Sequence, residues 1–91
     1  MKSDELQDVA DVCKLLSDTT RVATVAVLAK GTRTVGKLVR ELKLPQPTVS
    51  YHLALLRITG LLTRKRQGKE MHYSLNREAL EPVRAFLAKL E

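Results

Sequence analysis

Residues 47–56 read PTVSYHLALL, a stretch whose two halves differ in kind. On a helical wheel with 3.6 residues per turn, Val49, Leu53 and Leu56 form one apolar stripe, and Tyr51 points almost directly away from it. The first half therefore projects hydrogen-bonding groups outward, while the second half anchors the helix in a core. This division predicts a helix that is held by one end and makes contacts with the other.

Three more residues of this helix fall at the edge of the stripe or outside it. His52 lies at the margin and is expected to be partly packed. Leu55 and Ile58 lie outside the stripe, which predicts that the second half of the helix is buried on more than one side.

Residues that start or stop helices divide the rest of the chain. The prolines of "KLPQP" end the preceding helix, and Pro47 suits the first position of the helix at 47–59, where its missing N–H is not needed. Pro82 falls inside the last segment, which predicts a short first turn and a main helix from about Glu81. Four side chains are expected to cap the other helical segments, namely Ser3, Asp18, Thr34 and Asn76.

Residues 62–74 change in character, because Thr, Tyr and apolar residues surround the pair Gln67-Gly68. This pattern predicts a β-hairpin with that pair at its turn. The predicted register then sets three cross-strand pairs, Arg66 with Lys69, Lys65 with Glu70, and Leu62 with Tyr73.

The expected order is four helices, a β-hairpin and a fifth helix, in one mainly α domain spanning residues 1–91. With 44% apolar residues, a chain of 91 residues builds one marginal core and gains from burying more surface in a dimer. Two helices joined by the short connection "LPQ" and followed by a basic hairpin form the layout of a winged helix-turn-helix.

Both terminal helices, 4–16 and 77–90, carry apolar residues spaced three, four and three apart. Such seams fit an interface between two copies of the chain or its own core. The residues assigned to the interface are Leu6, Val9, Cys13, Leu16, Val83, Phe86, Leu87 and Leu90.

The formal net charge of +6 favours a polyanionic partner, although many proteins are basic for solubility alone. No apolar run approaches the ~18 residues that cross a membrane, and the segment MKSDELQD is too acidic and polar for a signal peptide. A lone cysteine, Cys13, excludes a disulfide within the chain and fits a reducing compartment. We therefore expect a cytoplasmic, nucleoid-associated protein without membrane contact.

The outward half of the helix at 47–59 carries groups that can contact DNA. Thr48 and Ser50 can bond to phosphates or bases, and Tyr51 can donate a hydrogen bond or pack on a thymine methyl. Gln46 can read adenine through its amide. Thr48 and Ser50 can equally be ordinary residues of a helix N-terminus.

The hairpin is the second basic feature. Arg64, Lys65, Arg66 and Lys69 crowd onto it, with Glu70 to offset them. Because cations at a hairpin tip repel each other, they favour an anionic groove, and binding should weaken as salt rises. A merely solvated hairpin is the alternative. Further basic residues near the third helix can add backbone contacts, namely Arg33, Lys37, Arg40 and Lys43.

Two segments, "LLSDTTRVATVAVL" and "TVGKLVRELKLPQPTVSYHLALLRITGLLTRKRQGKEMHYSL", carry a family resemblance. They resemble the ArsR/SmtB family of bacterial winged-helix repressors, closely over residues 15–75. The resemblance implies a homodimer joined by the first and last helices, a palindromic operator near a promoter, and release when an effector binds. By position, the family's DNA-reading helix matches Gln46, Thr48, Ser50, Tyr51 and His52, and its wing matches Arg64, Arg66 and Lys69.

The chain departs from the family at its metal sites. Many members sense soft metals through a Cys-x-Cys pattern at the start of the third helix, where residues 34–37 are TVGK. Others use Asp, His and Glu of the last helix, but "REALEPVRAFLAKLE" has no His. Zinc wants three or four N or S ligands, and Cys13, His52 and His72 fall on separate elements. We expect no metal and no cofactor, and the effector is unknown. Pro45 also replaces a frequent Ser cap.

Cys13 lies on the apolar seam of the first helix and is expected to act as a small buried hydrophobe. A thiol switch between the two chains of a dimer is the alternative.

These features predict a homodimeric repressor that binds double-stranded DNA at a palindromic operator. Helix 47–59 would enter the major groove, and the wing at 62–74 would contact the backbone or the minor groove. The alternative is a winged-helix protein-interaction module without sequence-specific reading. An enzyme is not expected, since the sequence offers no nucleophile-base pair, phosphate-cradling glycine loop or paired carboxylates in a plausible cleft.

Overall fold

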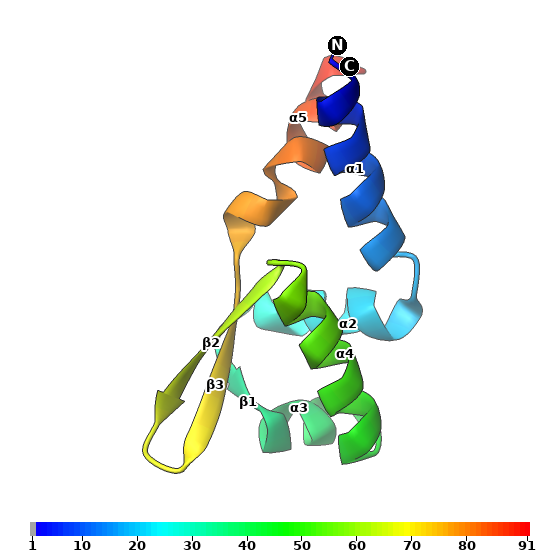
Figure 1. Ribbon diagram of the computed structural model, residues 1–91. Coiled ribbons are helices and arrows are strands. Elements are labelled where there is room, and N and C mark those ends of the chain that lie inside the picture. Colours follow the sequence, from blue (N-terminus) through cyan, green and yellow to red (C-terminus); the bar gives the residue numbers. More distant parts are fainter. Residues whose placement is uncertain (1) are drawn as a thin grey trace.

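Helices occupy both ends of the chain and a small sheet lies between them, in a computed structural model that describes residues 2–91 (Figure 1). The predicted mainly α winged helix-turn-helix is confirmed, including the short turn before the last helix. In chain order the elements are α1 (Ser3–Leu15), α2 (Thr19–Leu28), β1 (Arg33–Thr34), α3 (Val35–Leu42), α4 (Gln46–Ile58), β2 (Leu62–Gln67), β3 (Glu70–Leu75), the 3₁₀ helix η1 (Arg77–Leu80) and α5 (Glu81–Lys89).

The core forms around α4. The predicted stripe of Val49, Leu53 and Leu56 is buried, and it packs with apolar side chains of α2, α3 and the sheet. The prediction for the second half of this helix is wrong at Ile58, whose side chain is 74% exposed. Ile58 is the last residue of α4 and points to a side of the helix that the core, which includes Leu56 of the same turn, does not cover. Leu55 is half-buried.

Two of the predicted helix caps are confirmed and two are wrong. Asp18 accepts a hydrogen bond from the backbone N–H of Arg21, and Thr34 accepts one from Lys37. Ser3 lies inside α1, which begins one residue earlier than a Ser3 cap requires. The Asn76 side chain does not cap η1, because its amide donates instead to the carbonyl of Gly60 at 2.9 Å.

The sheet holds three antiparallel strands in the order β1-β3-β2, one more than the predicted hairpin. The additional strand β1 is two residues long, and Arg33 and Thr34 pair with Tyr73 and His72 of β3. A strand of two residues is too short to show an alternating hydrophobic pattern in the sequence. It is recognised only by its pairing with β3.

The predicted hairpin register is wrong, because the turn lies one residue later than expected and each cross-strand pair is shifted by two residues. Gln67 pairs with Glu70, and Arg64 pairs with Tyr73, so the turn consists of Gly68 and Lys69 instead of Gln67 and Gly68. Gly68 has φ +64° while Lys69 has an ordinary negative φ. A type II′ turn requires a positive φ at its first central position, which glycine supplies without strain.

The molecule measures 45 × 24 × 21 Å, and its long axis separates two regions (Figure 1). The helices α1 and α5 pack against each other at one end, where both termini also lie. The tip of the β2–β3 hairpin and the N-terminal end of α4 lie at the opposite end. This arrangement separates the terminal helices from the two predicted DNA-contacting elements.

Candidate nucleic-acid interface

The first turns of α4 present polar groups at the surface. Ser50 is exposed, Tyr51 is 60% exposed, and Gln46 lies exposed in the first turn. Thr48 is half-buried. Pro45 is the N-cap of α4, and among residues 2–91 no side chain caps this end. The first-turn amides of α4 can therefore donate to an outside acceptor such as a phosphate, which the helix dipole also favours.

His52 differs from the other residues in the predicted reading set, because its side chain contacts another helix. It is half-buried, and its Nδ1 atom lies 3.5 Å from Nη1 of Arg21 on α2. Its ring stands edge-on to the Tyr51 ring, with centroids 5.2 Å apart and an angle of 72° between the planes. The His52 ring thus contacts both Arg21 and the Tyr51 ring, while Tyr51 itself is largely exposed.

The N-terminus of α2 holds Arg21 in place. The backbone N–H of Arg21 donates to the Asp18 carboxylate and keeps the pKa of that carboxyl below its ordinary value. The guanidinium donates through Nε to the carbonyl of Leu15 at the end of α1. Sequence reasoning missed this role of Arg21, because its partner His52 lies 31 positions away.

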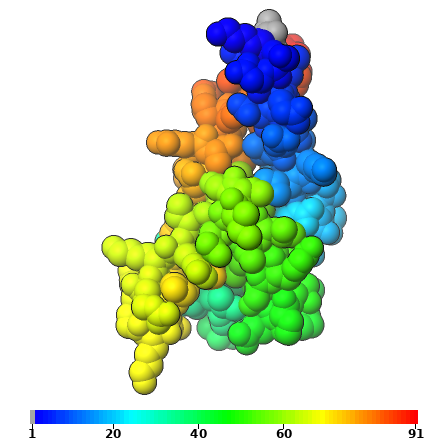
Figure 2. Space-filling view, in the orientation of Figure 1, coloured from blue at the N-terminus to red at the C-terminus, as the bar shows by residue number. Residues whose placement is uncertain are grey.

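The wing brings the four predicted cations to one projecting hairpin, seen in yellow in Figure 2. Arg64 and Arg66 are two positions apart on β2, so their side chains lie on the same face of the sheet. Tyr73, which pairs with Arg64, lies on that face as well. Nη1 of Arg64 donates to the Tyr73 hydroxyl at 3.4 Å. Lys69 is exposed in the turn, and Lys65 lies on the other face. His72 is half-buried on that same face, opposite Lys65.

Charge is distributed unevenly along the chain. Residues 19–75, which include the helix-turn-helix and the wing, hold eleven Lys and Arg against two Glu, a net charge of +9. Residues 1–18 hold two Lys against five acids, a net charge of −3. An anionic partner is therefore attracted to the wing end and repelled from the α1 end.

Not every cation near α3 is free to bind an anion. Lys37, Arg40 and Lys43 are exposed. Arg33 instead forms a salt bridge with Glu41, with Nε and Oε1 2.8 Å apart. Of the four cations predicted to add backbone contacts, three thus remain candidates.

The terminal helices leave much of their predicted seam uncovered in this single chain. Leu6 is 45%, Leu87 54% and Leu90 66% exposed. Cys13 is exposed in the single chain as well, so any burial of its thiol would come from a second copy. Val12, which lies outside the predicted seam, is the residue of α1 that reaches the core. The other seam residues are half-buried, namely Val9, Leu16, Val83 and Phe86.

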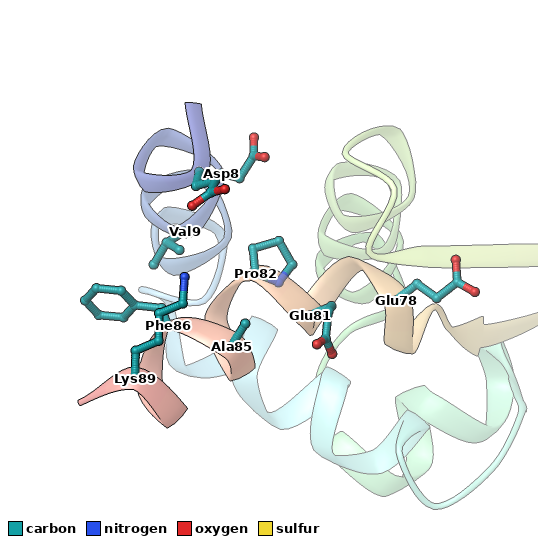
Figure 3. A pocket seen from close by; sticks show the side chains of 9 residues that line it. Asp8, Val9, Glu78, Glu81, Pro82, Ala85, Phe86 and Lys89 are labelled. Atoms are coloured by element: carbon teal, nitrogen blue, oxygen red, sulfur yellow. The ribbon is translucent and has the colours of Figure 1, made fainter. Parts of the chain in front are cut away.

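A groove of about 420 Å³ runs between α1 and α5. Figure 3 shows Asp8 and Val9 of α1 facing Pro82, Ala85 and Phe86 of α5 across it. Four carboxylates and one ammonium group border the groove, namely Glu5, Asp8, Glu78, Glu81 and Lys89. The acidic border does not suit a nucleic acid.

The three side chains weighed as metal ligands lie on α1, α4 and β3. Within residues 2–91 no group of three or more His, Cys, Asp or Glu side chains is arranged to hold a metal ion. In the same range, no helix has the length and the apolar character that crossing a membrane requires.

Comparisons with known proteins agree with this geometry. The model of the family described as "Bacterial regulatory protein, arsR family" matches residues 18–64. An arsenic resistance transcriptional regulator of Pseudomonas putida is 45% identical over 69 residues, covering 75% of this chain and 60% of that protein. The arsenical resistance operon repressor of Escherichia coli is 45% identical over 64 residues, covering 69% of this chain and 55% of that protein.

A solved structure extends the agreement to the fold. The transcriptional repressor BigR from Xylella fastidiosa is 31% identical and superposes with a TM-score of 0.80, covering 94% of this chain and 86% of that one. The chain spans little more than half the length of the two curated relatives named above. The matched family is one of regulators rather than enzymes. Because its model matches the helix-turn-helix and the start of the wing, the chain belongs to the arsR family of bacterial regulatory proteins.

Proposed function

We propose that the chain is a homodimeric transcriptional repressor that binds double-stranded DNA at a palindromic operator. One observation carries the proposal. The polar start of α4 and the basic wing lie at the same end of the molecule, with a net charge of +9 over residues 19–75. An exposed polar helix end beside a cationic hairpin suits a duplex with a groove between two phosphate backbones.

In the proposed complex, α4 enters the major groove by its N-terminal end. Gln46, Ser50 and Tyr51 are exposed there and can reach base edges, and Thr48 is close enough to the helix end to contact a phosphate. Arg64, Arg66 and Lys69 of the wing contact the backbone or the minor groove. His52 contributes by supporting Tyr51 rather than by touching DNA.

The dimer is proposed from the exposed seam of the terminal helices. Leu6, Leu87 and Leu90 expose apolar surface on two helices that already pack together. Burying this surface against a second copy is favourable, and small domains commonly need it. Two recognition helices related by a two-fold axis then contact half-sites about 34–36 Å apart or a multiple of it.

The cysteine content of the chain bears on the input to this repressor. Two of the relatives named above are regulators of arsenic or arsenical resistance. Soft ions of this kind are held by sets of thiolates, whereas this sequence contains one cysteine, Cys13. The proposed input is therefore not an arsenic species. Its proposed place of action is the nucleoid in the cytoplasm.

The test is to enrich DNA fragments with the purified protein and to titrate an enriched duplex against an unrelated duplex of equal length at two salt concentrations. A sequence-specific repressor binds the enriched duplex at least ten-fold more tightly, in keeping with the large specific-to-non-specific ratios of such proteins. Equal affinity for both duplexes would contradict the proposal. No binding to either would favour a protein-interaction module.

A further inference from the structure

A chain of side-chain contacts connects the end of α1 to the outer face of α4. Nε of Arg21 donates to the Leu15 carbonyl at 2.5 Å, and Nη1 of the same guanidinium lies 3.5 Å from Nδ1 of His52. The His52 ring then meets the Tyr51 ring edge-on, at 5.2 Å between centroids. One arginine thus contacts both a helix proposed to form the dimer and the helix proposed to read DNA.

Arg21 is suited to hold two partners at once. Its guanidinium is a planar fork of donors in fixed geometry, so a bond through Nε sets the direction of Nη1. Its backbone is held as well, because the N–H of Arg21 donates to Asp18 at 3.1 Å. Both ends of this side chain are therefore constrained, and it is half-buried.

The contact with Arg21 also selects one tautomer of a neutral His52 ring. A guanidinium has no acceptor, so Nδ1 of His52 must accept, and in the neutral ring the proton then resides on Nε2. This fixes which edge of the ring faces α2. Because the Tyr51 ring packs edge-on against the same imidazole, the ring orientation of His52 influences where the Tyr51 hydroxyl points.

Tyr51 has room to adopt other positions. Its side chain is 60% exposed, and it borders an open hollow of about 610 Å³ between α1, α2 and α4. Leu15, Arg21 and Leu55 line the same hollow. The aromatic ring is thus free on one side and supported by His52 on the other.

We propose that Arg21 is a positioning residue, which holds Tyr51 in its DNA-reading orientation through His52 and makes that orientation depend on the end of α1. The inference rests on the proposed function, since it assigns Tyr51 to base reading. It adds a route by which a rearrangement of the terminal helices changes DNA recognition. If the Leu15 carbonyl moves, the Arg21 guanidinium loses its bond to that carbonyl and is no longer held against His52. The Tyr51 ring then loses the contact that orients it.

The test is a double-mutant cycle on an operator fragment enriched by the wild-type protein. Affinity is measured for the wild type, Arg21→Gln, Tyr51→Ala and the double variant, with the same fragment changed at each base pair in turn. We expect Arg21→Gln to weaken operator binding about ten-fold, and to change it less than two-fold when Tyr51 is already alanine, because coupled residues are non-additive. Arg21→Gln should also relax discrimination at the same base pair as Tyr51→Ala.

Two further comparisons separate positioning from folding. Arg77 also donates to a backbone carbonyl of another element, that of Ala29 at 2.7 Å. Arg77→Gln therefore removes the same kind of arginine–carbonyl bond as Arg21→Gln and serves as its control. It should leave base discrimination unchanged. If Arg21→Gln fails to fold, the substitutions at His52 carry the test and leave the bond to Leu15 intact. Asn can place its amide oxygen near the position of Nδ1, so His52→Asn should retain more discrimination than His52→Gln.

The opposite results would overturn the proposal. One such result is that Arg21→Gln weakens operator binding equally whether residue 51 is Tyr or Ala. A second is that Arg77→Gln relaxes base discrimination. A third is that His52→Asn and His52→Gln discriminate between base pairs equally well. A Tyr51→Ala variant that binds like the wild type would also overturn it while leaving DNA binding itself intact. If the wild-type protein enriches no DNA, the proposed function has failed and the inference fails with it.

Discussion

Arg64 and Tyr73 lie directly opposite each other in the wing, and the guanidinium of Arg64 donates to the tyrosine hydroxyl at 3.4 Å. Tyr73 is buried, so it connects the base of the wing to the core. The guanidinium of Arg64 is therefore bonded to a residue of the core, although the side chain itself is exposed. A wing arranged in this way can place its cations along a phosphate backbone while α4 occupies the groove.

The first prediction concerns the salt dependence of binding. Replacing both Arg64 and Arg66 by Ala should make the plot of log affinity against log salt shallower by about two, since each neutralised phosphate contributes roughly 0.9 to the slope. The measurement is a titration of the enriched duplex over a range of salt concentrations. Lys2→Ala, at the other end of the molecule, is the control and should leave the slope as it is. A double variant with the wild-type slope would show that these arginines do not contact phosphates.

The second prediction concerns base reading by α4. Tyr51→Ala should weaken operator binding by about 1–3 kcal/mol if the side chain contacts a base. The free energy of unfolding should hardly change, because the side chain is largely exposed. Tyr51→Phe separates the contribution of the hydroxyl to operator affinity from that of the ring, since it retains the ring packing and removes the hydrogen-bond donor. Unchanged affinity in Tyr51→Ala would remove this residue from the interface.

The third prediction concerns the dimer. Leu87→Asp should shift the protein from dimer to monomer, because it puts a charge into the proposed apolar seam of α5. Sedimentation velocity measures the change directly. Ile58→Asp is the control, since it places the same charge at another exposed apolar side chain, 74% exposed against 54% for Leu87, outside the seam. A Leu87→Asp protein that remains dimeric would place the interface elsewhere.

The fourth prediction concerns acid stability. The pKa of Asp18 is lowered in the folded chain by the Arg21 backbone N–H, so its stabilising effect is present above the unfolded value of 3.8 and is lost as the pH falls through the folded value. Asp18→Ala should therefore lower the free energy of unfolding at neutral pH, and the difference from the wild type should shrink well below pH 3.8. Asp18→Asn retains the acceptor without the charge, so its difference from the wild type should be smaller than that of Asp18→Ala at neutral pH but should change with pH in the same way. A difference that is independent of pH would exclude the ionised cap.

Apolar spacing and capping residues predicted the fold well wherever the structure of a segment depends on its own sequence. The spacing of Val49, Leu53 and Leu56 correctly predicted the buried side of α4, and Asp18 and Thr34 cap their helices as expected. The misses come from partners distant in sequence. The strand β1 exists through its pairing with β3, and Asn76 bonds to Gly60 instead of capping its own segment.

The candidate site shows the same division. The wheel correctly placed Tyr51 on the outside of α4, but the pairing of His52 with Arg21 requires a fold that brings α2 beside α4. Periodicity likewise identified the seams of α1 and α5 without telling which of their residues face the core. The core takes Val12, and Cys13 stays exposed.

The most direct measurement is a backbone footprint of the protein on its enriched operator. Two equivalent half-sites should be protected, related by two-fold symmetry, with centres about 34–36 Å apart or a multiple of it. A single protected half-site, or two in the same orientation, would contradict a dimer that presents two α4 helices about one axis.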